Sequence, residues 1–247
     1  MRRITYKKAA AVAMAAALSA ALLVGCGSTA ASTVADESAA ESTAEDAEKT
    51  ADEGDADEVA AKKCADLIDA IYVQERNEDT DAQCEAAKAA WDALTDTQKE
   101  LVEGENADPD YFGRDTGDAS KDDARNQDDI GDNELLVVSF GTSFNDSRVK
   151  DIKGIEDALQ AAYPDWSVRR AFTAQIIINH VQARDGEKID NMQQAMDRAV
   201  ENGVKNLVVQ PTHLMHGAEY DEMMEMIDTY RDKFESVAVA EPLLGEV

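Results

Sequence analysis

Residues Leu135 to Ser143 read Leu-Leu-Val-Val-Ser-Phe-Gly-Thr-Ser, and the expected fold follows from this stretch. A short apolar run that ends at a glycine, here Gly141, is typical of a buried parallel strand and the turn after it. An amphipathic helix is expected next, because five apolar residues recur at helical spacing: Val149, Ile152, Ile155, Leu159 and Ala162. The sequence thus predicts a strand, a turn and a helix, the first unit of an open α/β sheet.

The same alternation continues to the end of the chain. Strands are expected at 135–139, 167–172, 207–210 and 237–240, and helices at 147–162, 174–184, 190–202 and 218–234. Repeated strand–helix units with short connections predict an α/β fold with a doubly wound, parallel four-stranded sheet. The last helix carries an apolar stripe that we expect in the core: Tyr220, Met223, Met224, Ile227, Tyr230 and Phe234.

In such sheets ligands bind outside the carboxyl ends of the strands. The turn 139–143 lies at this edge, and so do His213 and His216, which follow the third strand. A histidine there can accept a proton or bind a metal ion, or it can be a hydrogen-bonded loop residue. The turn has an equally ordinary reading, because Gly, Ser and Thr serve turns for backbone reasons. It matches neither a phosphate-binding loop nor a dinucleotide fingerprint.

Charge and cysteine content narrow the function further. The formal net charge of −28 argues against a nucleic-acid partner, because phosphates would be repelled. The three cysteines, Cys26, Cys64 and Cys84, form no C-x-x-C pair, so neither a zinc site nor a redox motif is supported.

The N-terminus has the features of a targeting segment. Residues 1–25 combine a basic start with an apolar run, which predicts a signal peptide. The sequence Leu-Val-Gly-Cys at 23–26 resembles the bacterial lipobox, which implies lipidation of Cys26 and an extracytoplasmic protein that is lipid-anchored to the cell membrane. Residues 26–58 are mainly Ala, Ser, Thr, Glu and Asp, and we expect a disordered acidic tether there.

A small helical module is expected at 59–104, where apolar residues return at helical spacing. Residues 86–102 are similar to small helical repeats of bacterial surface proteins, which implies a spacer or interaction module. Cys64 and Cys84 fall in two different helices of it, so an oxidising compartment predicts a disulfide between them. Residues 105–133 are rich in Asp, Gly, Asn and Ser, and we expect an acidic linker.

Several motifs in 134–247 occur together in a known order. They are the stretch 135–143, Arg-Arg-Ala-Phe-Thr at 169–173, Asp-Gly at 185–186, Val-Val-Gln-Pro-Thr-His at 208–213, Gly-Ala-Glu-Tyr at 217–220 and Pro-Leu-Leu at 242–244. This set resembles the anaerobic, class II sirohydrochlorin cobaltochelatases. The resemblance implies a bilobal fold in which a tetrapyrrole receives Co²⁺ as substrate metal, with no organic cofactor.

The resemblance also implies roles for residues of the first lobe. His213 is the implied catalytic residue. The tetrapyrrole ring would contact the turn after the first strand and residues of other segments. The implied substrate-binding residues are Ser139, Gly141, Thr142, Ser143, Arg170, Thr173 and Glu219. Arg170 would bind substrate carboxylates through charge-assisted hydrogen bonds.

The metal ligands of this family come mainly from a second lobe, which has no counterpart up to Val247, so no metal ligand is assigned. We expect a single copy of the chain to lack most of the catalytic apparatus, to be completed by a second lobe or by homodimerisation. Two alternatives remain: a surface lipoprotein that binds a tetrapyrrole or metal ion without catalysis, and a fragment that does not fold alone.

Overall fold

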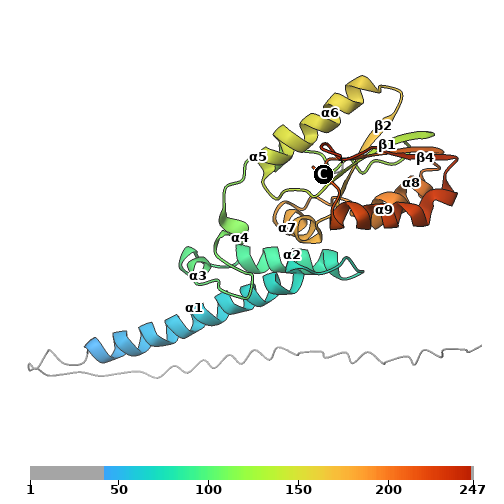
Figure 1. Cartoon of the computed structure of the whole chain (residues 1–247). Coiled ribbons are helices and arrows are strands. Elements are labelled where there is room, and N and C mark those ends of the chain that lie inside the picture. The colour runs from blue at the N-terminus through green and yellow to red at the C-terminus, as the bar shows by residue number, and fades with distance from the viewer. Residues whose placement is uncertain (1–41, 246–247) are drawn as a thin grey trace, which may run out of the picture. The chain divides into compact units, whose positions relative to one another are not determined.

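The computed structural model describes residues 42–245, with side-chain surroundings from residue 54 onward, so the predicted signal peptide and Cys26 lie outside the described residues. Within 42–245, no helix has both the length and the apolar character needed to cross a membrane. The elements appear in Figure 1 in this order: α1 Ser42–Tyr72, α2 Thr80–Asp92, α3 Asp96–Glu100, α4 Asp110–Gly113, η1 Ala119–Lys121, β1 Asn133–Ser139, α5 Asn145–Ser147, η2 Arg148–Ile152, α6 Lys153–Ala162, β2 Ser167–Phe172, α7 Gln175–Asp185, α8 Met192–Glu201, β3 Asn206–Pro211, α9 Ala218–Tyr230, η3 Arg231–Lys233 and β4 Ser236–Val239.

The sheet has four strands in the order β2-β1-β3-β4, and every neighbouring pair is parallel. Helix α6 lies on one face of it, and α7, α8 and α9 lie on the other (Figure 1). Successive β1 residues alternate between the two cores: Leu135 and Val137 pack on the α6 side, whereas Leu136 and Val138 pack against α8 and α9. The predicted doubly wound α/β fold is confirmed, and all four strands end at one edge.

The helical segment after β1 differs from its predicted apolar face. Ile155 is 40% exposed, whereas the charged Glu156 is fully buried. The reason is the π-helical turn Arg148–Ile152, whose wider hydrogen-bonding pattern rotates the residues after it relative to a regular helix. Glu156 thereby reaches the Arg170 guanidinium, with Nε to Oε1 at 2.8 Å. The predicted face for Ile155 was wrong.

The helices before residue 104 pack around one apolar cluster that also receives Ala183 of α7. Helix α1 begins at Ser42, so residues 42–58 of the predicted tether are helical in the structure. The amide Nδ2 of Asn179 on α7 donates to the carbonyls of Ile71 and Gln74, at 2.7 and 2.8 Å. These bonds join the end of α1 to the α/β domain.

The predicted disulfide is wrong, because Cys64 and Cys84 are free and buried. The Cys84 thiol turns toward α7 instead, where its Sγ lies 3.8 Å from the Asn179 carbonyl oxygen. Burial raises the pKa of each thiol to about 11, so both are protonated and unreactive at neutral pH.

Residues 105–133, predicted as an acidic linker, make many contacts in the structure. The Asp69 carboxylate accepts hydrogen bonds from the backbone N–H groups of residues 105, 106 and 107. Tyr111 stacks on the His180 ring with centroids 4.2 Å apart. The segment is therefore part of the folded domain.

Candidate functional site

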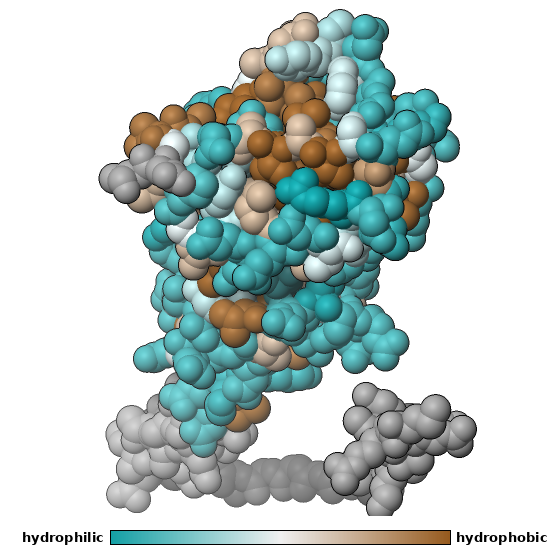
Figure 2. All heavy atoms as spheres, turned by 45° about the vertical axis from the view of Figure 1, so that its right-hand side comes forward, coloured by the Kyte–Doolittle hydropathy of each residue, from teal (hydrophilic) through white to brown (hydrophobic). Residues whose placement is uncertain are grey.

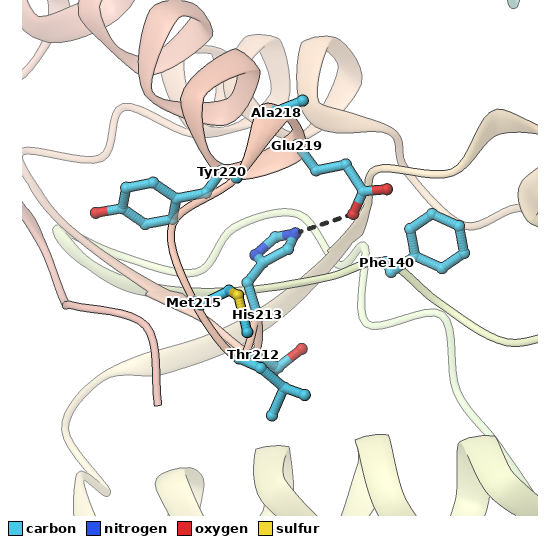
Figure 3. Close-up of a pocket in the computed structure, with 9 residues that line it drawn as sticks. Phe140, Thr212, His213, Met215, Ala218, Glu219 and Tyr220 are labelled. Atoms are coloured by element: carbon cyan, nitrogen blue, oxygen red, sulfur yellow. Dashed lines mark ion pairs between the residues drawn. The ribbon is translucent and has the colours of Figure 1, made fainter. Parts of the chain in front are cut away.

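A cavity of about 490 Å³ opens at the carboxyl edge of the sheet, between the ends of β1 and β3. Phe140 comes from the turn after β1, and the rest of the lining comes from the loop after β3 and the start of α9 (Figure 3). The lining residues are Phe140, Thr212, His213, Leu214, Met215, Gly217, Ala218, Glu219 and Tyr220. We call this cavity the His213 pocket.

The His213 side chain is only 8% exposed, and within the described part of the chain neither ring nitrogen has a hydrogen-bond partner. Its Nε2 faces the Glu219 carboxylate, with Oε2 3.8 Å away (Figure 3). Burial lowers the pKa of His213 from its ordinary value, and the charge of Glu219 opposes that shift. The imidazole is thus neutral near neutral pH and free to accept a proton or a metal ion.

Glu219 is about half exposed, so it connects the buried ring to solvent. His216 lies outside the lining: its Nε2 is 3.0 Å from Glu241 Oε2, and its ring meets Tyr220 edge-on. The two loop histidines therefore differ: His216 has a polar partner, whereas no residue that the structure describes lies within hydrogen-bonding distance of the His213 ring nitrogens.

Three predicted residues of the β1 turn shape the turn itself. The Thr212 hydroxyl donates to the Ser139 hydroxyl at 2.9 Å, which ties the ends of β1 and β3 together. Gly141 has φ of +100°, and a Cβ there would lie 2.5 Å from the Phe172 ring, so only glycine fits. Thr142 Oγ1 accepts the Phe144 N–H at 3.2 Å.

Two other predicted residues line different cavities. Thr173 faces a cavity of about 270 Å³ that shares Glu219 with the His213 pocket, and its hydroxyl lacks a partner among the described residues. Ser143 lines a cavity of about 190 Å³ beside His180 and Arg184. Of the predicted site residues, His213 and Glu219 line the main pocket.

The prediction that Arg170 meets substrate carboxylates is wrong. Its side chain is fully buried on the α6 side of the sheet, bonded to Asp122 and Glu156. The adjacent Arg169 faces the opposite side and pairs with Glu134 and Asp190. Alternation along β2 sends the two guanidinium groups into separate ion-pair networks, and neither reaches the pocket.

Sequence reasoning did not name four apolar or aromatic residues of the lining as ligand contacts, and it expected one of them, Tyr220, in the core; the four are Phe140, Leu214, Met215 and Tyr220. Phe140, Leu214 and Met215 are 47 to 60% exposed. Their position in the predicted ligand-edge loops was the available signal. As for metal, no group of three His, Cys, Asp or Glu side chains within the described residues is arranged to hold an ion.

Comparisons with known proteins relate the second half of the chain to cobalt chelatases. Residues 133–247 match the family described as cobalt chelatase (CbiK). The chain is 37% identical over 111 residues to a sirohydrochlorin cobaltochelatase of Salmonella typhimurium, covering 45% of this chain and 42% of that protein. It is 26% identical over 113 residues to the sirohydrochlorin cobaltochelatase CbiKC of Nitratidesulfovibrio vulgaris, covering 45% and 39%.

The chain thus spans about two fifths of the length of these curated relatives. The matched segment begins at the first residue of β1 and includes all four strands and the whole His213 pocket. The part of the chain that forms the sheet and the His213 pocket is therefore similar to cobalt chelatases (CbiK).

Proposed function

We propose that residues 133–247 bind a sirohydrochlorin-type tetrapyrrole at the His213 pocket and that the protein takes part in inserting Co²⁺ into that ring. One observation carries the proposal: a nearly buried imidazole without a hydrogen-bond partner among the described residues faces a carboxylate at the ligand edge of a cobalt-chelatase domain. The names of both relatives support the same substrate and metal for them.

Metal insertion into a free-base ring replaces two pyrrole N–H protons, so the reaction needs a base. The neutral Nε2 of His213 suits that role, because burial lowers its pKa and leaves it unprotonated near neutral pH. Glu219 would stabilise the resulting imidazolium and pass the proton to solvent. The side chains of Phe140 and Met215 offer apolar surface to the ring.

The test is an anaerobic titration of the full chain with sirohydrochlorin, followed by addition of Co²⁺. Ring absorbance reports binding, and insertion releases two protons per ring. Replacing His213 by Ala should slow insertion by about 10²-fold, the lower end for a general base, while affinity changes little. His216→Ala is the matched control, because His216 lies outside the pocket lining.

An unchanged insertion rate in His213→Ala would refute the role of His213. Ring binding without proton release would favour the alternative, a lipoprotein that captures a tetrapyrrole without catalysis. A chain that does not bind the ring at all would refute the proposed function.

We further propose that a second copy of the chain, or a separate second lobe, completes the cleft. The rim supports this, because Leu214, Leu243 and Leu244 are 60 to 64% exposed. Figure 2 shows hydrophobic residues gathered on the upper part of the face drawn, above a mainly hydrophilic surface. Light scattering of the full chain, with and without sirohydrochlorin, should give a dimer mass if a second copy serves.

We also propose that the protein is anchored to the membrane by lipid on Cys26 and lies outside the cytoplasm. The lipobox-like sequence at 23–26 supports this location. Intact mass of the protein from native membranes should equal cleavage before Cys26 plus lipid. Cys26→Ser should abolish recovery in the membrane fraction, whereas Cys64→Ser should leave it unchanged.

A further inference from the structure

Asp122 lies before the cobalt-chelatase residues 133–247 yet is buried within their domain. Its side chain is fully buried between two guanidinium groups. Oδ2 accepts from Arg148 Nε at 2.9 Å and from Arg170 Nη1 at 2.8 Å, and Oδ1 accepts from Arg170 Nη2 at 2.9 Å. The burial of an aspartate at this position is possible because both of its oxygens have charged partners.

Arg148 extends this contact to the turn after β1. Its fully buried guanidinium donates from Nη1 to the carbonyl oxygens of Thr142 and Ser143, at 3.3 and 3.4 Å. From Nη2 it donates to Asn145 Oδ1 at 2.5 Å and to Glu187 Oε2 at 3.1 Å. One guanidinium therefore joins Asp122 to three neighbouring positions of the turn.

The backbone just before Asp122 touches the same turn. The Asp146 N–H donates to the Thr116 carbonyl at 2.8 Å, and Asn145 Nδ2 donates to the Gly117 carbonyl at 3.3 Å. Residues 116–122 thus contact 142–146 through both main chain and side chain. The turn also carries Phe140, which lines the His213 pocket.

We propose that Asp122 is a positioning residue: acting through Arg148, it fixes the conformation of the turn 140–146 and with it the Phe140 wall of the His213 pocket. The effect on ligand binding rests on the proposed function, whereas the effect on the turn does not. The segment that precedes the chelatase domain then supports the site, and ligand affinity depends on residues outside the family-matched part of the chain.

A purely structural role would act through the other guanidinium. Arg170 leads away from the turn, to Glu156 on α6, with Nε to Oε1 at 2.8 Å and Nη2 to Oε2 at 2.9 Å. The two roles of Asp122 therefore use different partners, so substitution of Arg148 separates them.

The experiment compares Asp122→Asn with Asp157→Asn in the full chain. Asp157, on α6, is a matched control, because it also pairs with two cationic side chains, Arg125 and Lys153, but is half exposed. Hydrogen exchange of peptides covering 140–148 reports the turn, and absorbance titration with sirohydrochlorin reports affinity. Asp122→Asn should raise exchange and weaken affinity by about tenfold each, the factor expected for losing one charge-assisted bond. Asp157→Asn should change neither.

A double-mutant cycle with Arg148→Gln completes the test, or with Arg148→Lys if the Gln variant does not fold. In a chain that already carries the Arg148 substitution, Asp122→Asn should cause no further increase in the hydrogen exchange of peptides 140–148. It should still lower the thermal midpoint, because the contact of Asp122 with Arg170 is lost. The proposal is overturned if Asp122→Asn matches Asp157→Asn in exchange, or if its full effect persists without Arg148. Increased exchange in a chain whose wild type does not bind sirohydrochlorin would support positioning of the turn and refute the proposed function.

Discussion

At the residue scale, burial decides the protonation state of His180. His180 on α7 is stacked on Tyr111, and its Nε2 lies 2.7 Å from the Tyr111 carbonyl oxygen. Since a carbonyl can only accept, Nε2 carries the proton in the neutral ring. Burial, aided by the charge of Arg184, lowers the pKa of His180 from 6.5 to about 4. His180 is therefore neutral near pH 7 and has a structural role.

His180 should make stability depend on pH. Between pH 6.5 and 4 the unfolded chain binds a proton at this position and the folded chain does not, so its contribution to stability falls as pH falls. Relative to His180→Gln, wild type should lose about 2 kcal/mol of unfolding free energy between pH 7.5 and 5. Urea unfolding of both proteins at the two pH values measures this difference.

The comparison with a variant is needed because Glu134 acts in the opposite direction. Burial raises the pKa of Glu134 from 4.5 to about 7 despite its contact with Arg169. The folded chain therefore binds a proton there before the unfolded chain does, and stability rises as pH falls through this window. Both wild type and His180→Gln contain Glu134, so its contribution to the pH dependence cancels in the difference between them. A pH-independent difference would contradict the low pKa of His180.

At the element scale, α7 is buried on two sides. Ile178 and Val181 pack with Phe172 at the end of β2, whereas Ala183 joins the core of the N-terminal helices. Asn179 is fully buried at this junction, and its amide satisfies two carbonyls at the end of α1. This explains why α7 lacks a clear amphipathic pattern: its polar positions are also buried and bonded.

Replacing Asn179 by Ala should lower the free energy of unfolding by about 2 kcal/mol, because the Ile71 and Gln74 carbonyls lose their shared donor. Lys88→Ala is the comparison, since its ion pair with Asp92 is exposed and should contribute under about 0.5 kcal/mol. Thermal and urea unfolding provide the measurement. Equal small losses in both variants would show that α1 is not fixed by Asn179.

At the scale of the whole molecule, the N-terminal helices and the α/β domain share α7 and the segment 105–133, and we expect residues 54–245 to unfold together. Cys64 and Cys84 report this, because both thiols are free and fully buried. Under native conditions neither should react with a thiol reagent, and both should react in a single transition with urea. Mass spectrometry of the labelled peptides measures each cysteine separately.

Two results of the labelling would disagree with the structure. Labelling of Cys64 and Cys84 at urea concentrations well below those that expose β1 to hydrogen exchange would show that the N-terminal helices unfold first. If neither cysteine reacted in urea until a reductant was added, the two would form a disulfide after all.

Local pattern alone determined the order of strands and helices in 134–247 and the edge at which ligands would meet. The ends of the first and third strands could be predicted, because their apolar runs stop shortly before Gly141 and His213. Parallel strands bring such ends to the same edge of the sheet. His213 was expected at this edge because it follows the third strand, and in the structure it lines one pocket with Glu219, which the family resemblance had pointed to. Helical spacing likewise identified the stripe on α9, whose Met223 and Ile227 are fully buried.

Only the tertiary structure decided where the charged residues point. Composition placed Asp122 in an expected linker, and the family resemblance made Arg170 a ligand contact, yet the two neutralise each other inside the domain. A one-residue offset on β2 and the π turn before α6 decide which guanidinium meets which carboxylate. For the same reason the Cys84 thiol faces α7 and not Cys64. Contacts of this kind depend on packing between segments that lie far apart in the chain, and local residue spacing does not encode them.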